Sequence, residues 1–283
     1  MSGFSASWLA LRQPYDLRAR NADVLAAASA VMRRHDALRI TDLACGAGST
    51  ILALSRRASV PQAWRLVDND PALLAVAAQL PTPAHITIAP QLKDLRHDLD
   101  ALFEEQIDLL TTSALLDLVS EMWLEKLLQA VADHSTAFYA ALSYNGLIDF
   151  RPHDPLDAAV IAAVNAHQRT DKGFGAALGP KAADVAIKRL DALGFRVVHG
   201  PSDWVLGPND RVMQTELLQG WANAAREMAS IENAELEMWL TRRHAAIAEG
   251  ASSIRVGHVD FFAEPTGIRK PDKSQSNRSS SSI

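Results

Sequence analysis

The chain of 283 residues carries a net charge of −5, with 48% hydrophobic and 22% charged residues. These values are typical of a globular protein with a full core, and they argue against a general nucleic-acid binder, which usually has a basic domain. The single cysteine, Cys45, excludes an intrachain disulfide and indicates a reducing compartment. No signal peptide is apparent, and the apolar runs are too short to cross a bilayer. We therefore expect a cytoplasmic protein with no membrane partner.

Strand-like and helical patterns alternate along the chain. Helical spacing first predicts a helix over residues 22–35. Strands are predicted over residues 38–43, 63–67, 85–89, 107–112, 137–143, 195–199 and 254–263, with a further strand-like run at 204–206. Helices are predicted over residues 50–57, 120–133, 154–168, 180–193, 213–228 and 234–249, and from Asp70, as N-cap, into Pro71. This alternation predicts an α/β fold, a doubly wound and mostly parallel seven-stranded sheet with helices on both faces.

The same pattern predicts how the chain is organised. We expect an N-terminal helical cap over residues 1–35 and one Rossmann-like domain over residues 36–265. Helical insertions are expected near residues 150–179 and 210–250. Residues 266–283 are rich in Ser, Lys, Asn and Gln and predict a disordered tail.

A glycine-rich turn follows the first predicted strand and enters a helix. Gly46 and Gly48 allow the backbone to approach a ligand, and the helix N-terminus offers free N–H groups. Asp68 ends the next strand, where a carboxylate can accept hydrogen bonds from two ribose hydroxyls. The spacing also suits a dinucleotide site, but that pattern requires a third glycine where this chain has Ile51.

Several segments resemble a known family. The run from Asp42 to Gly48 resembles the first motif of the class I S-adenosylmethionine-dependent methyltransferases, and Leu66–Pro71 resembles their second. The pair Asp94–Leu95 falls where the family has its adenine-binding acid, and the run from Asp108 to Asp117 resembles the fourth motif. The resemblance covers about residues 36–145 and implies S-adenosylmethionine as cofactor, methyl transfer as activity and an antiparallel final strand, into which residues 254–263 fit.

The resemblance also implies which residues hold the amino acid part of the cofactor. The backbone at Ala44, Gly46 and Gly48 packs against it, and Asp42 holds its ammonium group. Arg20, just ahead of the first predicted helix, is a candidate for its carboxylate, with a solvated N-terminal face as the alternative.

Further roles concern the nucleoside and the methyl group. Asp68 would bind the ribose, and Asn69 would lie beside the adenine. Asp94 would accept from the adenine amino group with the Leu95 amide nearby, and Ser113 would line the methyl-transfer side.

Candidates for the acceptor side come from polar segments. Asp117 is a candidate general base, or the N-cap of the helix that follows it. His167 is the other candidate base, because it opens a polar segment punctuated by glycines. The predicted substrate-binding residues are Tyr144, His153, Asp171 and Lys172.

The sequence thus predicts methyl transfer from S-adenosylmethionine to a small polar molecule, with no nucleic acid and no metal as partner. Two alternatives stay open: a nicotinamide-dependent oxidoreductase and a non-catalytic S-adenosylmethionine-binding protein. The acceptor molecule, the acceptor atom and the oligomeric state are not determined by the sequence.

Overall fold

The computed structural model describes residues 5–267, so most of the predicted tail, residues 268–283, lies outside the described residues. Its sheet has the strand order β3-β2-β1-β4-β5-β8-β6, and the short β7 pairs with β8. The strands are β1 (Leu38–Leu43), β2 (Gln62–Asp68), β3 (Ile86–Leu92), β4 (Leu109–Ser113), β5 (Ala137–Arg151), β6 (Phe195–Pro201), β7 (Trp204–Leu206) and β8 (Ser253–Pro265). Strands β1 to β5 pair in parallel, whereas β8 is antiparallel to β5 and β6. The predicted fold class, including the antiparallel final strand, is confirmed, but the sheet has eight strands instead of the predicted seven because β7 pairs with β8.

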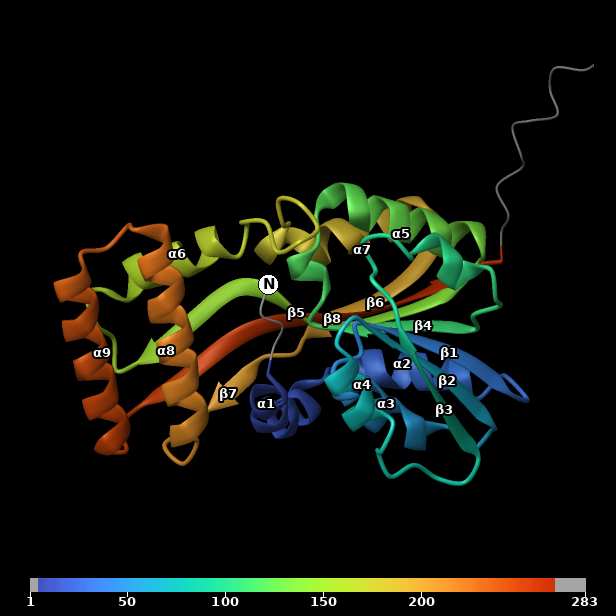
Figure 1. Ribbon diagram of the computed structural model, residues 1–283, viewed down its shortest axis with the longest axis horizontal. Coiled ribbons are helices and arrows are strands. Elements are labelled where there is room, and N and C mark those ends of the chain that lie inside the picture. The colour runs from blue at the N-terminus through green and yellow to red at the C-terminus, as the bar shows by residue number, and fades with distance from the viewer. Residues whose placement is uncertain (1–4, 268–283) are drawn as a thin grey trace, which may run out of the picture.

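Helices cover both faces of the parallel part of the sheet (Figure 1). The helices are α1 (Ala6–Ala19), α2 (Ala22–Met32), α3 (Ser49–Leu54), α4 (Pro71–Ala77), α5 (Glu121–Asp133), α6 (Asp157–His167), α7 (Ala182–Ala192), α8 (Arg211–Met228) and α9 (Asn233–Ala248). Helices α5 and α7 lie on one face, and α2, α3 and α4 on the other. The core follows the two-residue period of a strand: Phe138 and Phe261 join one buried cluster, and their neighbours Tyr139 and Phe262 join the other.

The long strand β5 departs from the sequence prediction. The predicted strand ends at residue 143, but β5 continues to Arg151 and pairs with β8 along this extension. The extension contains Asn145-Gly146, a dipeptide typical of tight turns. Here the pair lies in a shift of the β5–β8 register, with Gly146 at a φ of 91°. The strand therefore bulges instead of turning back.

The extension of β5 and β8 supports a third core. Helices α6, α8 and α9 pack on this ribbon, together with β7 (Figure 1). Phe150 and Trp239 lie inside it, with ring centroids 5.8 Å apart. Helix α1 lies in the middle of the molecule (dark blue in Figure 1), where the ribbon meets the carboxyl ends of the parallel strands. This position makes α1 a lid over that edge of the sheet.

The glycine turn after β1 supplies a test of the fold. A Cβ at Gly48 would lie 2.4 Å from Cδ1 of Leu80, and the residue has a φ of 85°. We expect Gly48→Ala to lower the free energy of unfolding by about 1–2 kcal/mol for the left-handed backbone, plus a further loss from this contact. Gly194→Ala shares the positive φ, 88°, but meets no atom within 4 Å, so it should cost less. Denaturant unfolding of both variants without ligand measures the difference, and equal stabilities would contradict this account of the turn.

Candidate functional site

The turn between β1 and α3 has a left-handed backbone conformation at three of its residues. Ala44, Gly46 and Gly48 all have positive φ values, of 48°, 52° and 85°. The N–H of Gly46 donates to the Asp68 carboxylate at 2.8 Å. Above the turn lies α1, whose Leu9 side chain would be 3.2 Å from a Cβ at Gly46. Asp68 therefore holds the Gly46 N–H of the turn, and the side chain of Leu9 covers the turn.

Asp68 joins the loops after two neighbouring strands. One carboxylate oxygen accepts from Gly46, and the other accepts from the N–H of Asp70 at 3.0 Å. The side chain is mostly buried, with the residue 8% exposed, whereas Asn69 beside it is exposed. Asp70 caps α4 through the N–H groups of residues 72 and 73, as the sequence predicts. Asp68 thus stands at the carboxyl end of β2, with unused lone pairs on both oxygens.

The third strand brings a second acid to the same edge. The N–H of Lys93 donates to the carbonyl of Asp68 at 3.0 Å, so the chain after β3 runs beside the end of β2. Asp94 is half-buried, and its hydrogen bond with Arg96 lowers its pKa to about 2. Leu95 is buried, and its carbonyl accepts from the indole of Trp123 at 2.8 Å. The structure brings Asp94 and Leu95 to the edge on which Asp68 stands.

Asp42, near the carboxyl end of β1, is a fully buried carboxylate. One oxygen accepts from the hydroxyl of Thr111 at 2.7 Å, and the other has no partner among the described residues. Burial raises the pKa of Asp42 to about 6, although the Thr111 hydrogen bond, the charge of Arg20 and a weaker interaction with the Thr50 hydroxyl act in the opposite direction. An unpartnered buried oxygen of this kind is costly, and it indicates a place for a ligand donor.

Arg20 brings a buried positive charge close to Asp42. It is 5% exposed and donates to the hydroxyls of Tyr139 at 3.1 Å and of Ser49 and Ser113 at 3.0 Å. Its Nε has no partner among the described residues. The alternative of a solvated N-terminal face is therefore wrong for Arg20. The Asp42 carboxylate and the Arg20 guanidinium thus bring opposite charges to the end of the glycine turn. Each group has one polar atom without a hydrogen-bond partner among the described residues.

Asp117 lies beyond the end of β4, in the short helical turn Leu116–Leu118. The helix that follows is capped by Ser120, whose hydroxyl accepts from the N–H of Trp123 at 3.3 Å. The interpretation of Asp117 as this cap is therefore wrong. Asp117 is 5% exposed, and its Oδ1 has no partner among the described residues. Burial raises its pKa to about 6, and backbone hydrogen bonds and the charge of Arg12 oppose the shift.

A second polar cluster, of which the sequence analysis singles out only Tyr144, surrounds the ring of Trp204. Arg12 lies over this ring at 5.1 Å and donates its Nε to Asp16 at 3.0 Å. The Trp204 indole donates to the other oxygen of Asp16 at 3.1 Å. His258 lies with its ring centroid 4.8 Å from that of Trp204 and 6.2 Å from that of Tyr144. This Trp204 cluster joins α1, β5, β7 and β8 next to Asp117.

Tyr144 belongs to this cluster, as a predicted substrate contact on β5. Its hydroxyl donates to Asn165 of α6 at 2.9 Å. Burial, with the nearby Asp117 charge as a lesser cause, raises the pKa of Tyr144. The phenol thus stays protonated and keeps lone pairs for a further donor.

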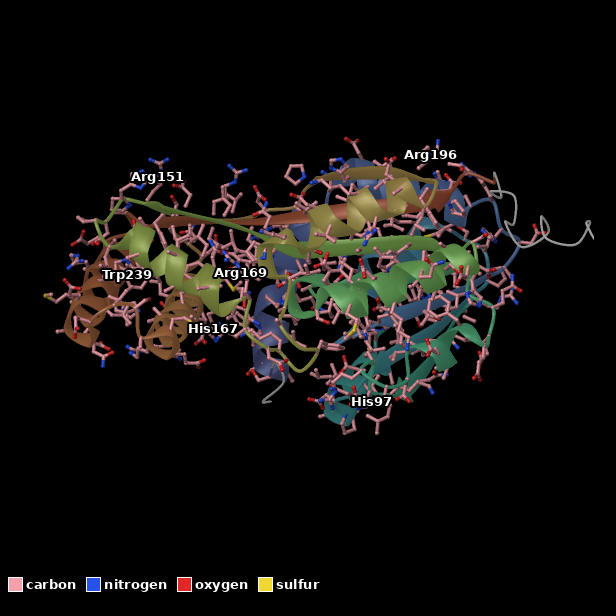
Figure 2. All side chains as sticks on the ribbon, turned by 90° about the horizontal axis from the view of Figure 1, so that it is seen from above. His97, Arg151, His167, Arg169, Arg196 and Trp239 are labelled. Atoms are coloured by element: carbon pink, nitrogen blue, oxygen red, sulfur yellow. The ribbon has the colours of Figure 1, made fainter. Side chains whose placement is uncertain are left out.

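The remaining acceptor-side predictions lie elsewhere. His167 ends α6, and its Nε2 is 2.9 Å from Glu227 of α8 and 3.4 Å from Nζ of Lys172. Asp171 is exposed, and one of its oxygens accepts from the N–H groups of Gly173 and Gly175. Figure 2 shows His167 on the α6–α8 side of the molecule. The base role of His167 and the substrate roles of Lys172 and Asp171 stay predictions.

His153 follows the far tip of β5. It is exposed and contacts Arg151, which Figure 2 shows at one extreme of the molecule. At about 3.3 Å per residue, the tip lies roughly 25 Å along the strand from Ser143. The structure does not bring His153 to the other candidates.

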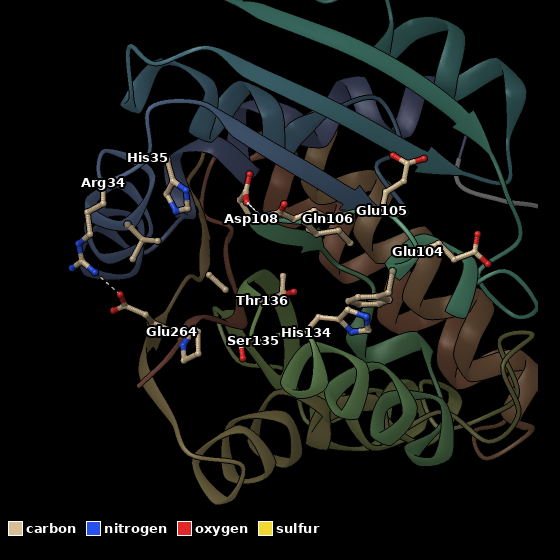
Figure 3. Close-up of a pocket in the computed structure, with 15 residues that line it drawn as sticks. Arg34, His35, Glu104, Glu105, Gln106, Asp108, His134, Ser135, Thr136 and Glu264 are labelled. Atoms are coloured by element: carbon tan, nitrogen blue, oxygen red, sulfur yellow. Dashed lines mark hydrogen bonds and ion pairs between the residues drawn. The ribbon is translucent and has the colours of Figure 1, made fainter. Parts of the chain in front are cut away.

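A separate hollow of about 650 Å³ opens at the amino ends of β1, β4 and β5, at the opposite edge of the sheet (Figure 3). Several of its charged groups are paired: Arg34 with Glu264, and Asp108 with Arg39. Within residues 5–267, no group of three or more His, Cys, Asp and Glu residues is placed to hold a metal ion. No helix in this part of the chain is long and apolar enough to span a bilayer.

No protein-family model and no curated protein sequence matches the chain significantly. Solved structures do show similarity to it. A methyltransferase from Thiobacillus denitrificans, in complex with S-adenosylhomocysteine, is 14% identical, with 92% of this chain and 99% of that chain covered and a TM-score of 0.41. A methyltransferase from Geobacter sulfurreducens, in the same kind of complex, is 13% identical, with 93% and 100% covered and a TM-score of 0.44. A cyclopropane synthase from Mycobacterium tuberculosis is 12% identical, with 92% and 95% covered and a TM-score of 0.48. The assignment of the fold rests on the strand order itself.

The buried carboxylate of Asp117 predicts a measurable cost in stability. Because its pKa rises from 3.8 to about 6 on folding, the folded protein binds more protons between these values, and stability falls as the pH rises through this window. Asp117→Asn removes the charge and should raise the free energy of unfolding above pH 6 by about 1–3 kcal/mol. Urea unfolding from pH 4 to pH 8 measures this. Asp191→Asn, at an exposed position, is the matched control. A destabilised Asp117→Asn protein above pH 6 would contradict the prediction.

Proposed function

We propose that the protein transfers the methyl group of S-adenosylmethionine to a small polar molecule. The observation that carries the proposal is that two buried polar atoms beside the glycine turn, Oδ2 of Asp42 and Nε of Arg20, lack hydrogen-bond partners among the described residues. The amino acid part of S-adenosylmethionine carries an ammonium and a carboxylate group, which suit these two atoms in charge and in hydrogen-bonding sense. A ligand of this chemistry relieves both desolvation costs at once.

The rest of the edge fits the same molecule. Asp68 retains lone pairs for two ribose hydroxyls. Leu95 and Asp94, whose two oxygens also accept from Arg96, stand beyond it for the adenine ring and amino group. Gly46 and Gly48, with positive φ values, shape the turn along which the methionine part would lie, with Leu9 as its cover. When bound, S-adenosylmethionine supplies a methyl group already activated by its positive sulfur. The chain then mainly has to exclude water and hold the acceptor in line, at roughly 3 Å from that methyl group.

A small acceptor is favoured by the cover over the site. Leu9 lies over the turn and Arg12 follows it one helical turn later, so α1 narrows access to the carboxyl edge of β1 and β4. The net charge of −5 gives no general attraction for a phosphate backbone.

The two alternatives have less support. A dinucleotide would place its pyrophosphate at this turn, close to the buried carboxylate of Asp42 and above Ile51 in place of the third glycine. A protein that only binds the cofactor has no need for Asp117, a buried carboxylate that costs stability. The base role of Asp117 is favoured over that of His167, whose ring nitrogen already faces Glu227.

Calorimetry tests the choice of ligand. We expect S-adenosylmethionine and S-adenosylhomocysteine to bind and NAD to show no comparable binding, because the turn suits an amino acid better than a pyrophosphate. Preferential binding of NAD would overturn the proposal.

Substitution of Asp68 tests the ribose assignment. Each charge-assisted hydrogen bond contributes about 1.5–3 kcal/mol, so Asp68→Ala should weaken S-adenosylhomocysteine binding by roughly one to two orders of magnitude or more. Asp68→Asn keeps the hydrogen bond to Gly46 and separates loss of charge from loss of loop support. Asp191→Ala, at the exposed position on α7, is the control. Full affinity in a folded Asp68→Ala protein would show that this carboxylate does not bind the ribose.

A further inference from the structure

The junction between α1 and α2 carries Arg20. Arg20 is the C-cap of α1 with a ψ of 132°, and Asn21 is the N-cap of α2 with a ψ of 125°, so neither residue continues a helix. A helical backbone therefore does not fix the direction of the Arg20 side chain. This direction depends instead on the contacts that hold the junction formed by Arg20 and Asn21.

Asp260 on β8 holds the main chain of this junction. The residue is fully buried, and its carboxylate accepts from the N–H of Asn21 at 2.9 Å and from the N–H of Leu142 at 2.7 Å, through different oxygens. Leu142 is buried and has a φ of 56°, a left-handed conformation that is unfavourable for a residue with a Cβ. Such a conformation persists only where its surroundings fix it. Asp260 thus joins the junction to the irregular part of β5.

The side chain of Asn21 gives a second attachment to the sheet. Its Oδ1 accepts from two N–H groups at the start of α2, and its Nδ2 donates to the carbonyl of Pro201 at 3.0 Å. A Cβ at Gly200 would lie 2.3 Å from this Nδ2 and 2.9 Å from the Asn21 Cγ, so the glycine leaves the room that the contact needs. Strands β6 and β8 therefore hold both the main chain and the side chain of the residue that follows Arg20.

The guanidinium of Arg20 is held by the same part of the sheet. It donates to the hydroxyl of Tyr139 on β5 at 3.1 Å and to two serine hydroxyls at 3.0 Å, while its Nε has no partner among the described residues. Tyr139 and Leu142 belong to one strand. Asp260 therefore fixes the junction relative to the strand that holds the guanidinium, and with it the place of the unpartnered Nε.

Resting on the proposed function, we propose that Asp260 is the positioning residue for Arg20 and that, with Gly200, it sets the preference of the site for ligands that carry an amino acid carboxylate. A hydrogen bond between a guanidinium and a carboxylate is short, at about 2.7–2.9 Å, and it weakens steeply when its angle is poor. Movement of the junction therefore weakens this contact. The ribose and adenine assignments rest on Asp68 and Asp94, at the edge formed by β2 and β3, and do not involve the junction.

Calorimetry with S-adenosylhomocysteine and with methylthioadenosine, which lacks the amino acid end, tests the inference. Asp260→Asn places an amide NH2 group against one of the two N–H donors, and Gly200→Ala displaces the side chain of Asn21. We expect each variant to reduce the preference for S-adenosylhomocysteine about tenfold. Methylthioadenosine should bind as tightly as it does to the wild-type protein, which shows that the variants are folded.

Asp157→Asn is the matched control. Asp157 is also buried, and it accepts from the N–H of Asp154 at 2.8 Å and from the indole of Trp239 at 2.9 Å. Because Trp239 belongs to the third core, Asp157→Asn should leave the preference unchanged. A similar loss of preference in this control overturns the inference, since it assigns the effect to general destabilisation.

An unchanged preference in Asp260→Asn and Gly200→Ala also overturns the inference. So does an equal loss of affinity for both ligands, because that is the effect of a purely structural role. If Asp260→Asn does not fold, Gly200→Ala, which retains the carboxylate, decides alone, and an unchanged preference in it is sufficient to overturn the inference. A wild-type protein that does not bind S-adenosylhomocysteine, or does not prefer it to methylthioadenosine, refutes the proposed function instead. The two failures are therefore distinguishable.

Discussion

The buried guanidinium of Arg20 is the constraint around which the site is arranged. A positive charge in the interior has to be solvated by fixed partners, and here the guanidinium donates hydrogen bonds to three hydroxyl oxygens, one each from α3, β4 and β5. The carboxylates of Asp260 and Asp16 add favourable charge from two further elements. Asp260 in turn accepts from the backbone of Asn21 and Leu142, at the start of α2 and in the irregular part of β5. One charge thus sets the relative positions of the N-terminal helices and the carboxyl edge of the sheet.

Helix α1 makes one continuous site out of two clusters. Leu9 covers the glycine turn, and Arg12 and Asp16 complete the group around Trp204. Arg20 follows at its end and reaches Ser113. Because a single helix carries all of these contacts, movement of α1 would open the turn and the acceptor side together. One oxygen of Asp42 and one of Asp117 are buried without a partner among the described residues. The folded chain therefore retains a desolvation cost at both carboxylates, which a ligand can relieve.

The part of the site that is local in sequence is the part that sequence patterns predict. Asp42, Gly46 and Gly48 occupy one strand and turn, and Asp68 ends the adjacent strand, so the parallel sheet alone brings them together. Arg12 and His258 carry no such signal, because the long β5–β8 ribbon and α1 bring them together from opposite ends of the chain.

Two errors have local physical causes. The predicted fifth strand ends at residue 143, whereas pairing with β8 on both sides of Asn145-Gly146 accommodates a bulge and carries β5 on to Arg151. Asp and Ser are both favoured N-cap residues, so the sequence alone does not distinguish Asp117 from Ser120 as the N-cap of α5. The structure shows that Ser120 caps this helix.

The central claim is that Asp42 and Arg20 recognise the amino acid end of the ligand. It is tested most directly by comparing the affinities of S-adenosylhomocysteine and methylthioadenosine, which lacks that end, for the wild-type protein and for Asp42→Asn. The account predicts that the wild-type protein prefers S-adenosylhomocysteine by about two orders of magnitude, and that Asp42→Asn removes much of this preference while it leaves methylthioadenosine binding unchanged. Equal affinities of the two ligands for the wild-type protein would contradict it.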